Sequence, residues 1–263
     1  MIMKRTTIVL LRRFVSVLLV ACVTLPAAAQ FEFQYQLGRL TNPFSGAKAT
    51  TQILTLQHAQ QWKYGDSFIF LDFLNDEGTD GFNDLDFYGE WYPTLSLGKV
   101  TGSEIKIGPI RDIGAIAGLS FGGDPNVLKF MPGGRLSWQI PGFIFLNTDF
   151  TAIVDHNYGL ARGGAPATEN NFMFDVSWLV LFSLGEQGFA FTGHAEYISE
   201  TTDELGNKVN AWILAQPQLT WDLGANLKYA NHLHVGIEYQ YWRNKLGTDN
   251  HDNTAQLLVV FRF

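Results

Sequence analysis

The chain has almost no means of forming disulfide bonds, because its single cysteine is Cys22. A secreted chain without disulfide bonds depends on backbone pairing and burial for its stability. Long hydrophobic runs are missing as well, and no window reaches the roughly 20 apolar residues that a membrane-spanning helix requires. These two absences exclude a disulfide scaffold and a helical membrane protein.

The N-terminus has the three parts of a secretory signal peptide. Basic residues come first, a short apolar run follows, and small residues end the segment: Lys4, Arg5, Arg12 and Arg13, then 14–20, then 27–29. We expect residues 1–29 to be a signal peptide and 30–263 to be the mature domain. An alternative is lipoprotein processing at Cys22, whose preceding small residues fit that pattern. The apolar residues after Cys22, through Leu25, favour cleavage after Ala29 instead.

Charged residues are few, at 16% of the chain, whereas Phe, Trp and Tyr make up 14%. Removing residues 1–29 takes away four basic side chains and leaves 14 basic residues against 25 acidic ones. This acidic balance excludes nucleic acid as an expected partner. The high aromatic content is typical of a β-barrel whose lipid-facing band ends in aromatic girdles.

Alternation with period two is the main structural signal, because it places successive side chains on opposite faces of a strand. In 232–242 the alternate residues from Leu233 to Tyr241 are apolar, whereas His234, Glu238 and Gln240 are polar. The pattern predicts an all-β, transmembrane antiparallel barrel of about twelve strands. The expected strands are 31–40, 49–60, 66–75, 84–97, 111–121, 127–140, 143–155, 172–184, 189–198, 211–223, 232–242 and 254–263. A soluble β-sandwich is the rival fold, but it would have to cover these apolar faces with a second layer.

The connections alternate in length. Tight turns are expected at 141–142 and 185–188, and long polar loops at 157–171, 199–210 and 244–253. Short turns on the periplasmic side and long loops outside are characteristic of bacterial barrels, with 98–110 as a long exception. The C-terminal strand ends aromatic-x-aromatic at Phe263, which resembles the signal read by the barrel-assembly machinery.

The faces assigned to the lumen are acidic and aromatic. Twelve strands give a bore between barrels that side chains fill and wide aqueous porins. Flat rings can stack on a base or a sugar, and carboxylates accept hydrogen bonds from hydroxyls or amines. Alternatively, these residues only form hydrogen bonds and ion pairs with one another across the lumen, with Arg135, Arg162 and Lys208 as counter-charges. The inward carboxylates are Asp72, Asp86, Glu90, Asp149, Asp155, Asp175, Glu196, Asp222 and Glu238, and the inward aromatic residues are Phe68, Phe70, Tyr88, Tyr92, Phe145 and Trp212.

Two stretches carry a family resemblance. Gln61-Trp62-Lys63-Tyr64-Gly65-Asp66 with its continuation to Phe73, and Leu85-Asp86-Phe87-Tyr88-Gly89-Glu90-Trp91, resemble early strands of the Tsx-like nucleoside-specific channels, the family that includes OmpK. The resemblance implies a monomeric twelve-stranded outer-membrane barrel that passes nucleosides. The expected solute-contacting residues are Phe68, Phe70, Asp72, Asp86, Tyr88 and Glu90, joined by Glu196 and Glu238 from the acidic inward faces.

Catalytic and metal-binding patterns are weak. The Ser/His/acid arrangement of outer-membrane lipid-modifying enzymes is missing. His194 and Glu196 share a face and could form an acid-base pair, although a structural pair is the simpler interpretation. His232 and His234 have the spacing of two metal ligands without an evident third. No catalytic residue, cofactor or metal is therefore expected.

The sequence thus predicts an outer-membrane channel for small polar solutes, with outer-membrane lipid and a nucleoside-like solute as its partners. One alternative is a surface receptor that acts through its long loops. A second is a lipid-modifying enzyme.

Overall fold

The computed structural model describes residues 29–123 and 126–263. The predicted signal peptide lies outside the described residues except for Ala29, where the first strand begins. The strands of the barrel wall are β1 (Ala29–Thr41), β2 (Lys48–Trp62), β3 (Gly65–Asp76), β4 (Asp84–Ser96), β5 (Ile110–Gly122), β6 (Leu128–Trp138), β7 (Phe145–Asp155), β8 (Asn171–Leu184), β9 (Gln187–Ile198), β12 (Trp212–Ala215), β13 (Gln218–Asp222), β14 (Leu233–Arg243) and β15 (Asp252–Arg262).

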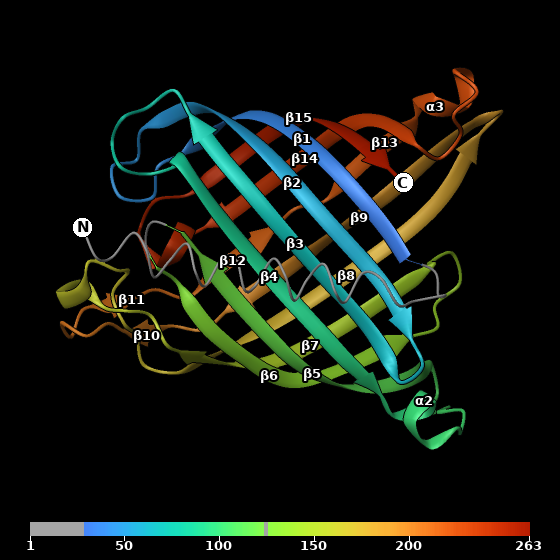
Figure 1. Ribbon diagram of the computed structural model, residues 1–263, viewed down its shortest axis with the longest axis horizontal. Helices are drawn as coiled ribbons and strands as arrows, with labels where there is room; N and C mark the ends of the chain where they lie inside the picture. The colour runs from blue at the N-terminus through green and yellow to red at the C-terminus, as the bar shows by residue number, and fades with distance from the viewer. Residues whose placement is uncertain (1–28, 124–125) are drawn as a thin grey trace, which may run out of the picture.

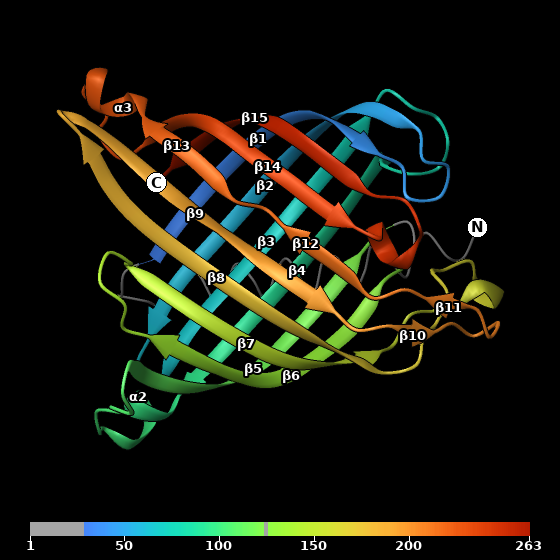
Figure 2. The ribbon, with the colours of Figure 1, turned by 180° about the vertical axis from the view of Figure 1, so that it is seen from behind.

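The strands form a closed antiparallel barrel of twelve positions (Figures 1 and 2). Each strand pairs with its neighbours in sequence, and β1 closes the barrel against β15. β12 and β13 share one position, because both pair with β9 on one side and with β14 on the other. The predicted fold and strand number are confirmed.

The interruption between β12 and β13 has a local cause. Pro217 has no backbone N–H to donate to a ladder. Opposite it, Gly193 has a φ of +145°, and a Cβ at this position would lie 2.4 Å from the carbonyl oxygen of Gln216. Only glycine permits this approach, so the bend is specified by both strands.

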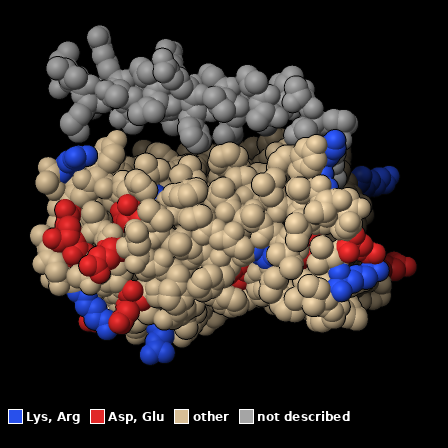
Figure 3. All heavy atoms as spheres, turned by 90° about the horizontal axis from the view of Figure 1, so that it is seen from below, with Lys and Arg blue, Asp and Glu red and all other residues tan. Residues whose placement is uncertain are grey.

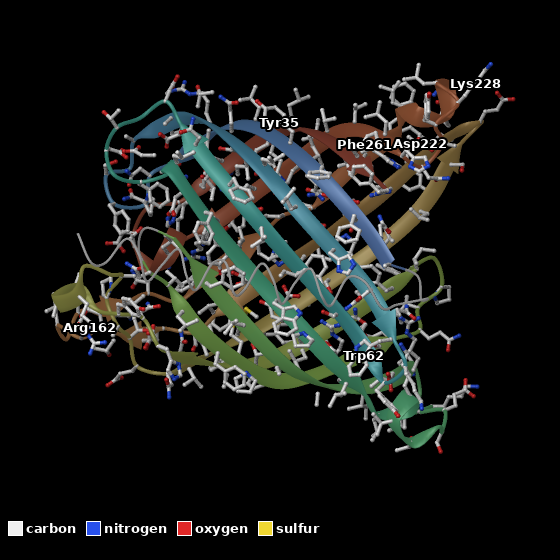
Figure 4. The ribbon with its side chains drawn as sticks, in the orientation of Figure 1. Tyr35, Trp62, Arg162, Asp222, Lys228 and Phe261 are labelled. Atoms are coloured by element: carbon white, nitrogen blue, oxygen red, sulfur yellow. The ribbon has the colours of Figure 1, made fainter. Side chains whose placement is uncertain are left out.

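The alternation along the strands separates an outer from an inner face. On β1, Phe33 and Tyr35 are exposed on the outside, whereas Gln34 and Gln36 are buried on the inside. Tyr35 is labelled in Figure 4. On β15, Leu257 is 57% exposed and its neighbour Leu258 is fully buried. The inside and outside assignments predicted for these strands are therefore confirmed.

The two ends of the barrel differ. At the turn end, β1 begins, β15 ends, and β2–β3 and β8–β9 are joined by tight turns (Figure 1). The short helices α2 (Leu97–Thr101) and α3 (Leu223–Asn226) also lie there. The opposite, loop end carries the longer connections, including η1 (Leu160–Arg162), the small hairpin of β10 (Thr201–Thr202) and β11 (Lys208–Val209), and η2 (Lys245–Gly247).

The outer surface is apolar between two aromatic zones. Near the loop end, the rings of Phe150 and Phe172 lie 5.4 Å apart, and Tyr197 lies 6.1 Å from Phe172. Near the turn end, Phe182 and Phe189 stack at 5.4 Å. Figure 3 shows charged atoms gathered at the two ends of the visible face, with few in the band between. No helix among the described residues is long and apolar enough to cross a bilayer. An apolar band bounded by aromatic residues on a closed barrel defines an outer-membrane β-barrel.

Candidate functional site: the barrel lumen

One side of the lumen is filled by a glutamine-rich network on β1, β13, β14 and β15. At its centre is Glu238, which is only 2% exposed. Its Oε2 accepts from Gln36 at 2.8 Å and from Gln218 at 2.7 Å. Its Oε1 accepts from Gln256 at 2.9 Å and from Gln216 at 3.3 Å. With every member but Gln216 buried, this network seals its part of the wall against water.

The wall formed by β3 and β4 is different, because its inward side chains are only half-buried. Register places Asp72 opposite Tyr88, Phe70 opposite Glu90, and Phe68 opposite Tyr92. Inward side chains that keep exposed surface border a space that water can enter. The strands therefore bring five of the eight predicted contact residues, Phe68, Phe70, Asp72, Tyr88 and Glu90, onto one continuous surface.

Hydrogen bonds fix the polar groups of this β3–β4 surface. The carboxylate of Glu90 accepts from the hydroxyls of Tyr88 at 2.5 Å and Tyr92 at 2.7 Å. Asp72 accepts from Thr55 on β2 at 2.6 Å. The ring of Phe70 lies 6.1 Å from that of Tyr88 and 6.2 Å from that of Phe68. The surface thus combines rings suited to stacking with carboxylates held in place.

On β8 and β9, Asp175, His194 and Glu196 also face the lumen and keep exposed surface. His194 Nδ1 lies 2.9 Å from Asp175 Oδ1, and His194 Nε2 lies 3.0 Å from Gln216 Oε1. The ring nitrogens of His194 therefore contact Asp175 and Gln216 rather than Glu196, although Glu196 lies in the same group, with ligand atoms of all three residues within 4.8 Å of one another.

The turn-end mouth carries fixed charges. Arg135 makes a bidentate pair with Asp149, at 2.8 and 2.7 Å, and contacts Asp66 at 3.1 Å. Beside it, a cavity of about 480 Å³ lies between the β4–β5 connection and the barrel wall, lined by Asp66, Lys99, Arg111, Asp112 and Ser137 among others. Arg135 is thus the lumen counter-charge predicted from the sequence.

Arg162 and Lys208, the other two predicted counter-charges, are placed elsewhere. Arg162 is exposed in η1 at the loop end (Figure 4). Lys208 is exposed on β11 and pairs with Glu200 at 2.8 Å. The prediction was wrong for both because their positions belong to loops that extend beyond the wall.

The remaining predicted residues are spread over the barrel. Asp86 lies near the loop-end start of β4 and accepts from the N–H of Phe87 at 2.7 Å. Asp222 caps α3 at the turn end, where it accepts from the N–H of Asn231 at 2.8 Å. His232 Nδ1 contacts the carbonyl of Arg262 at 2.7 Å, and His234 Nε2 lies 3.2 Å from that guanidinium. The two histidines therefore contact Arg262 rather than a third metal ligand.

At the loop end, a buried lysine that sequence patterns did not single out anchors the β14–β15 loop. Lys245 is 2% exposed, and its Nζ lies 3.0 Å from Asp252. The ammonium also lies 5.6 Å from the ring centroid of Phe82 and 5.2 Å from that of Trp242. Burial lowers the pKa of Lys245, although Asp252 acts in the opposite direction. The loop is thereby tied to the β3–β4 loop across the rim.

Replacing Lys245 should loosen this loop. In Lys245→Met, Asp252 stays buried without its cation, which is unfavourable enough to promote local opening. We expect proteinase K to cleave within 244–251 of the folded variant faster than in the parent protein. Lys228→Met, an exposed lysine beyond α3, is the matched control and should leave the rate unchanged. Equal cleavage of both variants would show that Lys245 does not hold the loop.

Comparison with known proteins adds to the class already defined. Neither a scan against protein-family models nor a search of curated proteins finds a match. Among solved structures, the NanC porin has a TM-score of 0.52 at 12% identity, covering 87% of this chain and 98% of that one. The KdgM porin has a TM-score of 0.46 at 8% identity, covering 88% and 99%. An outer-membrane channel from Pseudomonas putida F1 has a TM-score of 0.48 at 12% identity, covering 91% and 97%. The likeness to NanC shows a shared barrel fold.

Proposed function

We propose that the protein is a diffusion channel of the outer membrane that passes small polar solutes, with nucleosides favoured. The observation that carries the proposal is the β3–β4 surface, where rings and anchored carboxylates face a space open to water. Stacking on Phe68 and Phe70 suits a flat base, and the oxygens of Asp72 and Glu90 suit the hydroxyls of a ribose. The similarity of this segment to Tsx-like channels supports nucleosides in particular.

Charge is a second argument for such a solute. Carboxylates outnumber cations on the half-buried lumen surface, so an anionic solute would be repelled. A neutral solute with hydrogen-bond donors meets no such penalty. The solute proposed is therefore uncharged, polar and partly aromatic.

Conductance in planar bilayers tests the channel. We expect small, steady currents that thymidine or adenosine blocks at low concentration, whereas glucose and glycine do not. Currents unaffected by nucleosides would reject the nucleoside preference. If no current is seen and removal of the 156–170 loop abolishes binding of a surface partner, the receptor alternative is the better one.

The aromatic contacts have their own test. Phe68→Ala and Phe70→Ala should each weaken nucleoside block about fivefold, since an aromatic contact contributes about 1 kcal/mol. Phe73→Ala is the matched control on the same strand, because Phe73 points outward. Block that is unaltered in the first two variants would remove the rings from the proposal.

A further inference from the structure

Three side chains on the β8–β9 wall have the arrangement of metal ligands. Asp175, His194 and Glu196 each offer one ligand atom, and these atoms lie within 4.8 Å of one another. Asp175 pairs directly with Glu196 in the register of β8 and β9. His194 lies two residues before Glu196, on the same face of β9. The group thus comes from two adjacent, rigidly paired strands rather than from flexible loops.

The hydrogen bonds around His194 decide which ring nitrogen is available. The amide nitrogen of Gln216 donates to Glu238 at 3.3 Å and to Gln240 at 3.4 Å. Its oxygen therefore faces His194 Nε2, and that nitrogen must carry a proton to donate. The lone pair of a neutral ring is then on Nδ1, which points at Asp175. A histidine whose other N–H is held by a neighbouring oxygen is typical of metal ligands.

Nδ1 and Asp175 Oδ1, only 2.9 Å apart, need a cation between them. A proton is one solution and a metal ion is the other. Zinc binds nitrogen and carboxylate oxygen at about 2.0–2.2 Å, so its ligands lie roughly 3.3 Å apart. Binding therefore requires the three atoms, which lie within 4.8 Å of one another, to shift to that spacing.

The surroundings favour a cation and give it access. The carboxylate of Glu90, on β4, interacts electrostatically with both His194 and Asp175. Lys129 is the opposing charge, and it interacts with Glu90 and Glu196. The side chain of His194 is 34% exposed, so an ion can enter from the lumen on its side and retain water in an open coordination position.

We propose that Asp175, His194 and Glu196 bind one divalent transition-metal ion of the zinc type inside the lumen. One imidazole with two carboxylates suits zinc or cobalt, whereas calcium and magnesium prefer sites made of oxygen alone. Gln216 is a positioning residue that fixes the histidine tautomer. The site goes beyond the channel function and does not depend on it.

Zinc binding to the purified, untagged chain in detergent tests the site, with titration calorimetry as the readout. We expect one Zn²⁺ per chain with a dissociation constant in the micromolar range or below. His194→Gln and Glu196→Gln should each weaken binding at least tenfold. Gln216→Leu should weaken it roughly 10- to 100-fold although it leaves all three ligands in place. A tenfold excess of Mg²⁺ should not displace the zinc.

His234→Gln is the matched control, since His234 is also a lumen histidine but contacts Arg262 instead of a carboxylate. Its zinc affinity should equal that of the parent chain. Heat-modifiable migration on a denaturing gel verifies that every variant is folded. Absence of stoichiometric binding, or equal binding in His194→Gln and the parent, would overturn the proposal and leave a proton between Nδ1 and Asp175. Calorimetry requires no transport, so its result is separate from that of the conductance test.

Discussion

Glu238→Ala should destabilise the barrel by at least about 3 kcal/mol. The substitution removes one acceptor from four amide groups, of which those of Gln36, Gln218 and Gln256 are buried. Gln34 remains as a second acceptor for Gln36 and Gln218, so each of these amides loses one of its two bonds. Each buried N–H left unpaired costs roughly 1–3 kcal/mol. The free energy of unfolding in urea, measured in phospholipid vesicles, gives the comparison.

Two further variants make the result specific. Glu238→Gln keeps one acceptor oxygen but turns the other into a donor. Its free energy of unfolding should therefore lie between that of the parent and that of Glu238→Ala. Glu186→Ala removes an exposed carboxylate from the β8–β9 turn and should change stability by less than about 0.5 kcal/mol. If Glu238→Ala and Glu186→Ala were equally stable, the amides would be pairing with one another.

Leu257→Arg should cost about 2–4 kcal/mol, because Leu257 lies midway along β15 on the outer face. Its register partners Leu37 and Ile237 are also apolar, so the guanidinium would have to remain among lipid tails. The matched control is Leu205→Arg. Leu205 is 67% exposed, more than Leu257, but it lies in the loop between β10 and β11.

Folding into vesicles in a urea series measures both arginine variants. Leu205→Arg should fold with nearly unchanged stability, since that position meets water. Similar losses for the two variants would mean that the outer face of β15 does not meet lipid. If both variants were as stable as the parent protein, Leu257 would lie outside the hydrocarbon layer.

The strands were predictable because lipid outside and polar side chains inside impose the same period-two pattern on most of them. On β14, for example, the alternation of His234, Glu238 and Gln240 with apolar residues already assigned the faces that the structure shows. The break at Pro217 was harder to predict from the sequence. Trp212 and Gln218 lie on either side of it, and both keep to the even-numbered positions that face the lumen, so the alternation continues across the break. Without the structure, 211–223 was therefore one strand.

Contacts inside the lumen were less predictable, since they depend on register between strands. Sequence spacing placed His194 beside Glu196, but the close neighbour of His194 is Asp175 from β8. The role of Gln216 depends on a bend in the wall that no local pattern reports. Lys245 likewise lies in a polar loop, and only the folded loop shows that it is buried. The proposed solute preference therefore rests on the predicted residues that share the β3–β4 surface.

The pairing of β1 with β15 has a consequence for how the barrel assembles. Among the described strands, every other wall contact joins barrel positions that follow one another along the chain, whereas Glu32 and Arg262 meet across 230 residues. Closing so long a loop costs roughly 3–4 kcal/mol more entropy than closing a short hairpin. Until it closes, the sheet has two free edges whose backbone groups find no partner in lipid. Intermediates should therefore be sparse inside the membrane, and the rate of insertion should depend on how quickly these two distant strands meet.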